Sequence, residues 1–183
     1  EALGFVFFKE SPRCINPEAA KDVISSLPPN AMTVGVFVDA PRDVVLKTVK
    51  TTGIRMLQFH GSEKPDYCSS FGLPFVKAFR VRRMESLEEI RLYSKAYAFL
   101  LDAYSETGFG GTGMVFNWDF AIFAKRFGRI ILAGGLTPDN IAGAVRYVMP
   151  YAVDVSSGVE AAKGKKDHEA VRLFIERAKA AVK

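Results

Sequence analysis

The chain has 183 residues, 49% of them hydrophobic and 25% charged, a balance that excludes a disordered chain and suits one globular domain with a sizeable core. The formal net charge of +5 would suit an anionic partner, but lysines and arginines are scattered among acidic residues, which argues against a nucleic-acid-binding patch. No apolar stretch approaches the roughly 18 residues of a membrane span, and no signal-peptide pattern appears, so we expect a cytoplasmic protein without membrane or nucleic-acid partners.

Short apolar runs alternate with longer segments of helical spacing along the whole chain. Seven runs rich in Val, Ile, Leu and Phe predict strands buried on both faces, at residues 3–8, 33–38, 56–59, 75–79, 98–101, 130–133 and 152–155. Helices are predicted at residues 17–27, 42–51, 65–71, 86–93, 119–127, 138–148 and 167–181. Start signals occur at Asn16 before Pro17, at Thr137 before Pro138, and at Ser86 with Glu89. Strict alternation of this kind favours a parallel sheet covered by helices.

An open doubly wound sheet and a closed barrel both fit this alternation. The dinucleotide-binding pattern GxGxxG is absent, and polar or glycine-rich residues follow nearly every strand rather than one switch point, which favours the barrel. Such barrels have eight strands and usually at least ~200 residues, whereas this chain starts directly in a strand and offers seven. We therefore predict a single α/β domain over residues 1–183, a (βα)₈ TIM barrel from which the first strand and helix are missing.

Polar residues at the strand ends are the candidate site residues, because strand ends and the loops after them build the site in this fold. Arg13 follows the first run, and its guanidinium suits a carboxylate or phosphate, although a loop arginine can also form a surface ion pair. His60 ends the third run and is either a donor to substrate or a structural group. Asp102 ends the fifth run, where its carboxyl group can act as a general acid or hydrogen-bond the following turn. The glycines within residues 108–113 indicate a loop able to close over a ligand.

Two late loops together predict a phosphate site. Gly134 and Gly135 follow the sixth run and let the backbone approach a ligand closely, and Ser156, Ser157 and Gly158 follow the seventh. In (βα)₈ barrels the loops after the last two strands commonly bind phosphate through backbone N–H groups. We therefore expect one phosphate to lie between these two loops. The two cysteines have no metal-ligand spacing, and no metal site is predicted.

Six segments in chain order carry a resemblance to a known family: ALGFVFFKESPR, VGVFVD, LQFHG, LLDAYSETGFGGTG, ILAGGLTPDNI and VDVSSGVE. They run through the whole chain, and in this order they are highly specific. On these residues the chain resembles the phosphoribosylanthranilate isomerase family of tryptophan biosynthesis. The resemblance implies isomerisation of N-(5-phosphoribosyl)anthranilate to 1-(2-carboxyphenylamino)-1-deoxyribulose 5-phosphate. This Amadori rearrangement needs one acid and one base and no cofactor.

The resemblance also implies a role for each candidate residue. Asp102 matches the family's general acid, which protonates the furanose ring oxygen and opens the ring to a Schiff base. Arg13 matches the residue that binds the anthranilate carboxylate, and His60 would lie beside the substrate. The phosphate-binding amides would come from Gly135, Ser157 and Gly158.

One part of the family pattern does not occur in these residues. The family's general base is a cysteine in a KICGIT motif at the end of the first strand, and the sequence starts after that motif. Cys14, in a loop after a later strand, and Cys68, in a predicted helix, do not replace it. We therefore expect impaired turnover from the chain as given. The strands at 3–8 and 152–155 would lack a neighbour, which would favour a homo-oligomer, strand exchange or low stability.

Two other interpretations stay open. The chain could be a catalytically silent fragment that binds a phosphorylated ligand, or a subunit that a separate piece completes. It could also be another sugar-phosphate barrel enzyme, such as a metal-dependent epimerase. That chemistry needs a cluster of histidines and carboxylates, and the chain has only His60 and His168.

Overall fold

The computed structural model describes residues 1–81, 83–103 and 118–182 of the chain. They fall into two compact units. Unit 1 comprises Glu1–Ala78 and Leu92–Tyr97, and unit 2 comprises Phe79–Arg91 and Ala98–Lys183. Both units consist of parallel strands followed by helices, as the alternating pattern predicts. One domain over residues 1–183 stays a prediction.

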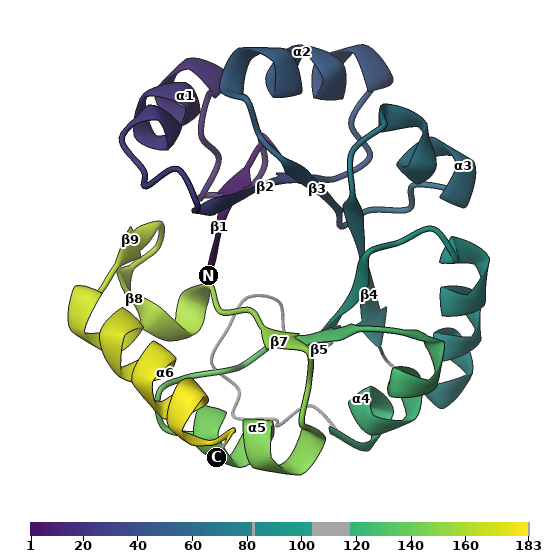
Figure 1. Ribbon diagram of the computed structural model, residues 1–183, viewed down its shortest axis with the longest axis vertical. Helices are drawn as coiled ribbons and strands as arrows, with labels where there is room; N and C mark the ends of the chain where they lie inside the picture. Colours follow the sequence, from purple (N-terminus) through teal and green to yellow (C-terminus); the bar gives the residue numbers. More distant parts are fainter. Residues whose placement is uncertain (82, 104–117, 183) are drawn as a thin grey trace. The chain divides into compact units, whose positions relative to one another are not determined.

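Unit 1 contains the first three helices and the strands around them. Its elements are β1 (Ala2–Val6), α1 (Pro17–Ser25), β2 (Met32–Phe37), α2 (Arg42–Thr52), β3 (Met56–Phe59), α3 (Pro65–Cys68), η1 (Ser69–Phe71) and the start of β4 (Phe75–Val81). Neighbouring strands pair in parallel in the order β1-β2-β3-β4. Helices α1, α2 and α3 lie on the same side of these strands (Figure 1). The carboxyl ends of all these strands therefore share one edge.

Unit 2 repeats this plan and adds a small hairpin. The 3₁₀ segment η2 (Met84–Tyr93) follows β4, and then come β5 (Ala98–Ala103), α4 (Trp118–Ala124), η3 (Lys125–Phe127), β6 (Ile130–Leu132), α5 (Ile141–Val148), β7 (Ala152–Val153), η4 (Ser157–Val159), β8 (Glu160–Ala162), β9 (Lys165–Lys166) and α6 (His168–Ala180). Strands β5, β6 and β7 pair in parallel, and β8 and β9 pair antiparallel.

Capping residues read from the sequence fix several helix ends. The Asn16 side chain accepts a hydrogen bond of 2.7 Å from the Ala19 N–H, and Pro17 occupies the first turn of α1. Asp167 caps α6 by accepting from the N–H groups of Glu169 and Ala170. These bonds satisfy donors that have no partner within the helix.

The core consists of apolar side chains between the strands and the helices of each unit. In unit 1, Phe37, Leu57 and Phe59 have no exposed surface. In unit 2, Leu101 and Leu132 are equally buried. Each fully buried side chain of this size contributes roughly 1.5–3 kcal/mol to stability. None of the helices in the described part of the chain has the length and hydrophobicity that a membrane span requires.

The structure differs from the sequence prediction in several places. Residues 86–93 lie in a 3₁₀ segment that starts at Met84, because the buried residues Leu87, Ile90 and Tyr93 repeat every three positions, the period of a 3₁₀ helix. The helix expected at 138–148 begins at Ile141, after a turn. Strand β1 is exposed over its first three residues rather than buried on both faces. The hairpin β8–β9 and η4 were not predicted.

Candidate active site

The structure places Arg13 and His60 at the carboxyl ends of unit 1 strands. The loop after β1 folds back, because Ile15 N–H donates to the Val6 carbonyl at 2.9 Å, and Arg13 N–H donates to the Ser11 hydroxyl at 3.2 Å. His60 directly follows β3, and its N–H donates to the Phe37 carbonyl at the end of β2 at 2.9 Å. Both side chains are half-buried. The parallel register thus brings both residues to the same edge of the unit 1 sheet.

A buried charged pair at this edge was not among the sequence candidates. Lys77 on β4 lies 3.2 Å from Glu63 in the loop after β3, measured from Nζ to Oε2. Glu63 also accepts hydrogen bonds from the N–H groups of Asp39 and Gly61. The sequence signal was a lysine inside the apolar run 75–79, because a lysine in a buried strand needs a partner.

Asp102 lies in β5 of unit 2, one residue before the end of the strand. It follows Leu100 and Leu101, which are almost fully buried, and is itself half-buried. A carboxyl group at this position stands at the boundary between the apolar core and the strand ends. Residues 104–117, which include the glycine-rich segment expected to close over a ligand, lie outside the described residues.

The loop after β6 has an unusual backbone that hydrogen bonds hold in place. Gly134 and Gly135 have φ angles of 81° and 66°, a left-handed conformation that residues with a side chain rarely adopt. The Asn140 side chain donates to the Gly135 carbonyl at 2.9 Å and accepts from the Thr137 N–H at 2.9 Å. Asn140 therefore ties the glycine loop to the start of α5.

The loop after β7 packs directly against this glycine loop. At Gly158, a Cβ atom would lie only 1.8 Å from the Leu136 carbonyl oxygen, so this position tolerates glycine alone without a backbone shift. The Lys166 ammonium on β9 donates to the Ser156 carbonyl at 2.7 Å and lies 3.1 Å from Glu160. Ser156 and Ser157 are exposed, and Gly158 is half-buried. Unit 2 thus brings the two predicted phosphate loops together.

The two cysteines lie in different surroundings. Cys68 is fully buried, and burial raises the pKa of its thiol to about 12, so the thiol stays protonated at neutral pH. Cys14 is exposed in the loop after β1. Within the described ranges, no group of three His, Cys, Asp or Glu side chains is arranged to hold a metal ion.

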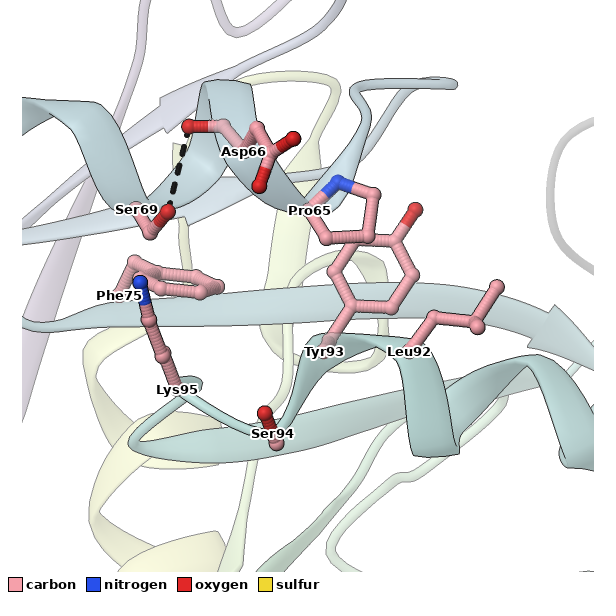
Figure 2. Close-up of a pocket in the computed structure, with 8 residues that line it drawn as sticks. All are labelled: Pro65, Asp66, Ser69, Phe75, Leu92, Tyr93, Ser94 and Lys95. Carbon is pink, nitrogen blue, oxygen red and sulfur yellow. Dashed lines mark hydrogen bonds between the residues drawn. The ribbon is translucent and has the colours of Figure 1, made fainter.

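The pocket in Figure 2 contains none of the candidate site residues. It has a volume of about 120 Å³, well below the ~300–1,000 Å³ of typical ligand sites. Phe75, the first residue of β4, lines it, so it opens at the amino end of that strand. Figure 2 also shows the Ser69 hydroxyl donating to the Asp66 carbonyl at 3.2 Å. We assign no ligand to this pocket.

Parallel βα units with polar residues at the strand ends, and two small-residue loops in contact after late strands, define an α/β protein built from βα units. A sequence profile described as N-(5'phosphoribosyl)anthranilate (PRA) isomerase matches residues 1–177. The chain therefore belongs to the N-(5'-phosphoribosyl)anthranilate isomerase family.

Among individual proteins, N-(5'-phosphoribosyl)anthranilate isomerase of Geobacter sp. (strain M21) is 55% identical over 179 residues, which span 98% of this chain and 87% of the relative. Identity at this level over nearly the whole chain agrees with the resemblance that the sequence segments carry.

Three solved structures are similar over 98% of this chain. Phosphoribosyl anthranilate isomerase of Thermotoga maritima has a TM-score of 0.91 at 37% identity, with 88% of its own chain covered. A second structure is an isomerase in complex with reduced 1-(o-carboxyphenylamino)-1-deoxyribulose 5-phosphate (rCdRP), with a TM-score of 0.87, 34% identity and 87% coverage. A third, of monomers generated from the dimeric Thermotoga maritima enzyme, has a TM-score of 0.86, 34% identity and 87% coverage. The TIM-barrel fold class predicted from the sequence is confirmed.

Proposed function

We propose that this chain isomerises N-(5-phosphoribosyl)anthranilate to 1-(2-carboxyphenylamino)-1-deoxyribulose 5-phosphate in tryptophan biosynthesis, by acid–base chemistry without a cofactor. The observation that carries the proposal is the contact between the two late loops of unit 2. At Gly158 a Cβ atom would lie 1.8 Å from the Leu136 carbonyl oxygen, so the two loops are in direct contact. A phosphorylated sugar suits such a pair of loops, because backbone N–H groups bind phosphate well.

Each candidate residue has a role in the proposed reaction. Asp102 donates a proton to the furanose ring oxygen, the C–O bond of the ring breaks, and a Schiff base forms between C1 and the anthranilate nitrogen. A base then removes the C2 proton, and the electron pair of the C1=N bond moves to nitrogen to give an enolamine. The enolamine gains a proton at C1 as its C2 hydroxyl loses one, which forms the ketone of the product. Arg13 binds the anthranilate carboxylate, since its guanidinium matches a carboxylate with two parallel hydrogen bonds. His60 lies beside the substrate.

The phosphate group binds to backbone amides of the loops that contain Gly134, Gly135 and Ser156–Gly158. In Gly135, φ is 66° and an added Cβ atom would meet nothing within 4 Å, so a side chain there would project into open space. A side chain at this position would therefore obstruct the ligand while leaving the fold intact.

Gly135→Asn tests the phosphate loop, because asparagine tolerates the left-handed backbone better than other side chains. We expect Gly135→Asn to weaken rCdRP binding about tenfold or more in isothermal titration calorimetry. The matched control is Gly53→Asn, at the end of α2, where φ is 69° and nothing lies within 4 Å of an added Cβ atom. This control should leave affinity unchanged. Equal affinities for the two variants would contradict the proposed phosphate site.

We also propose that the protein acts in the cytoplasm and forms a homo-oligomer, the latter because a related isomerase is described as dimeric. Sedimentation velocity at increasing protein concentration measures this. A single monomeric species at all concentrations would contradict the oligomer.

A further inference from the structure

A buried polar cluster in unit 1, next to His60, joins the carboxyl ends of β2 and β3 to Lys77, the third residue of β4. At its centre, the side chains of Lys77 and Glu63 are 3% and 2% exposed, and their charged atoms are 3.2 Å apart. Removing two charges from water is costly, and a buried ion pair often stabilises a fold no better than apolar residues of the same size. Fold stability alone does not account for a charged pair in this place.

The Lys77 ammonium holds the peptide group just before His60 and the carbonyl of Gly61, the residue after it. Its Nζ donates to the carbonyl of Phe59 at 3.2 Å and to the carbonyl of Gly61 at 2.7 Å. Because His60 N–H donates to the Phe37 carbonyl, the backbone of His60 is fixed from β2 as well as from β4. The direction in which the imidazole leaves the backbone is thereby restricted.

Glu63 ties the loop after β3 to the loop after β2. Its Oε1 accepts from Asp39 N–H at 2.8 Å, and its Oε2 accepts from Gly61 N–H at 3.0 Å. In return, Asp39 Oδ1 accepts from Ser62 N–H at 2.7 Å. Asp39 has a φ of 46°, a conformation that costs energy for a residue with a side chain and persists only where neighbours hold it.

The approach of the two loops leaves no room for a side chain at Gly61. A Cβ atom there would lie 2.6 Å from the carboxyl group of Asp39. Both loops that flank His60 are therefore locked through Glu63 and Lys77.

We propose that Lys77 and Glu63 are positioning residues, which set the orientation of His60 toward the substrate. This inference rests on the proposed function, in which His60 lies beside the phosphorylated substrate. Neither residue reaches the substrate, and each acts on binding through His60. Losing the pair then removes the contribution of His60 to affinity even where the fold survives.

A double-mutant cycle tests this, with rCdRP affinity from calorimetry as the readout. The pair variant Glu63→Gln/Lys77→Met removes both charges together, so no buried charge is left unpaired. We expect about tenfold weaker binding for the pair variant and for His60→Ala, and about tenfold rather than about a hundredfold for the triple variant, because coupled residues are not additive. Lys125→Met is the control. It removes an ammonium group that donates to the Val148 carbonyl in unit 2, and it should leave affinity unchanged.

The outcomes separate the two levels of the proposal. A loss of affinity of about a hundredfold in the triple variant would overturn the positioning role. So would unchanged affinity in the pair variant while His60→Ala binds weakly. Unchanged affinity in His60→Ala would instead overturn the proposed place of His60 in the site, and the positioning role with it. If the pair variant does not fold, Glu63→Asp replaces it, because aspartate keeps the charge but is too short to reach both N–H groups. We expect Glu63→Asp to weaken rCdRP binding about threefold in the otherwise wild-type protein and not to weaken it further in His60→Ala. A loss of affinity of about threefold in both backgrounds would overturn the proposal.

Discussion

The sharpest test of the phosphate loops is Gly158→Ala. The added Cβ atom would lie 1.8 Å from the Leu136 carbonyl oxygen and 2.9 Å from its carbon, and real Cβ contacts essentially never fall below 3.0 Å. The two loops must therefore separate by at least about 1.2 Å, the difference between 3.0 and 1.8 Å. Overpacking of this kind costs roughly 1–3 kcal/mol of stability. A displacement of ~1 Å of the groups that position a substrate can lower the reaction rate about a hundredfold.

We expect Gly158→Ala to weaken rCdRP binding about tenfold or more in calorimetry, while chemical denaturation still shows a folded protein. Gly143→Ala, within α5, is the matched control in the same unit. Its added Cβ atom would meet only the Trp118 ring, at 3.9 Å. This variant should keep full affinity and gain roughly 0.5–1 kcal/mol of stability. Wild-type affinity in Gly158→Ala would refute the reasoning that these two loops enclose the phosphate.

Three further predictions concern other residues. Arg13→Met should weaken rCdRP binding about 10- to 100-fold, as expected for a lost charge-assisted hydrogen bond, but should not change the affinity of an analogue without the ring carboxylate; equal losses for both ligands would contradict the carboxylate role. Lys166→Met should weaken rCdRP binding about threefold or more, because the Lys166 ammonium donates to the Ser156 carbonyl at 2.7 Å. Lys163→Met, in the exposed turn of the same hairpin, should leave affinity unchanged. Equal affinities for the two variants would contradict this role of Lys166. The folded state raises the pKa of Cys68 from 9.0 to about 12, so its stabilising contribution is complete below pH 9 and is lost as the pH rises toward 12. Between pH 9 and about 12, the unfolding free energy of the wild-type protein should fall more steeply with pH than that of Cys68→Ala, by up to about 1.4 kcal/mol per pH unit. Parallel pH curves for the two proteins would contradict this prediction.

Much of the fold could be predicted because its strands and helices differ in period. Residues 56–59 form a strand in which every side chain is buried, and three of the four, Met56, Leu57 and Phe59, are apolar, which is the pattern expected of a strand covered on both faces. The hairpin of Glu160–Ala162 and Lys165–Lys166 left no such pattern, because its strands are short and mostly exposed. Segment 84–93 has a period of three, close enough to 3.6 to be taken for an α-helix.

The place of the candidate residues in the fold was predictable from their positions along the chain, whereas their roles stay predictions. Arg13, His60 and Asp102 follow or end strands, and the parallel fold itself carries such residues to the strand ends. Glu63 and Lys77 were missed because charged residues usually lie on the surface, and only the pairing of β3 with β4 brings these two together.

Turnover by the Asp102→Asn variant tests the central claim most directly. The assay follows conversion of N-(5-phosphoribosyl)anthranilate by a protein in which a family βα unit with the KICGIT motif is joined to Glu1, because the resemblance assigns the base to the cysteine of that motif. We predict turnover by this protein and a loss of about 10²- to 10⁴-fold in kcat for Asp102→Asn, the usual contribution of a general acid, with rCdRP affinity retained. Near-normal turnover by Asp102→Asn would contradict the assignment of Asp102 as the acid, and absence of turnover in the parent protein would contradict the proposed function.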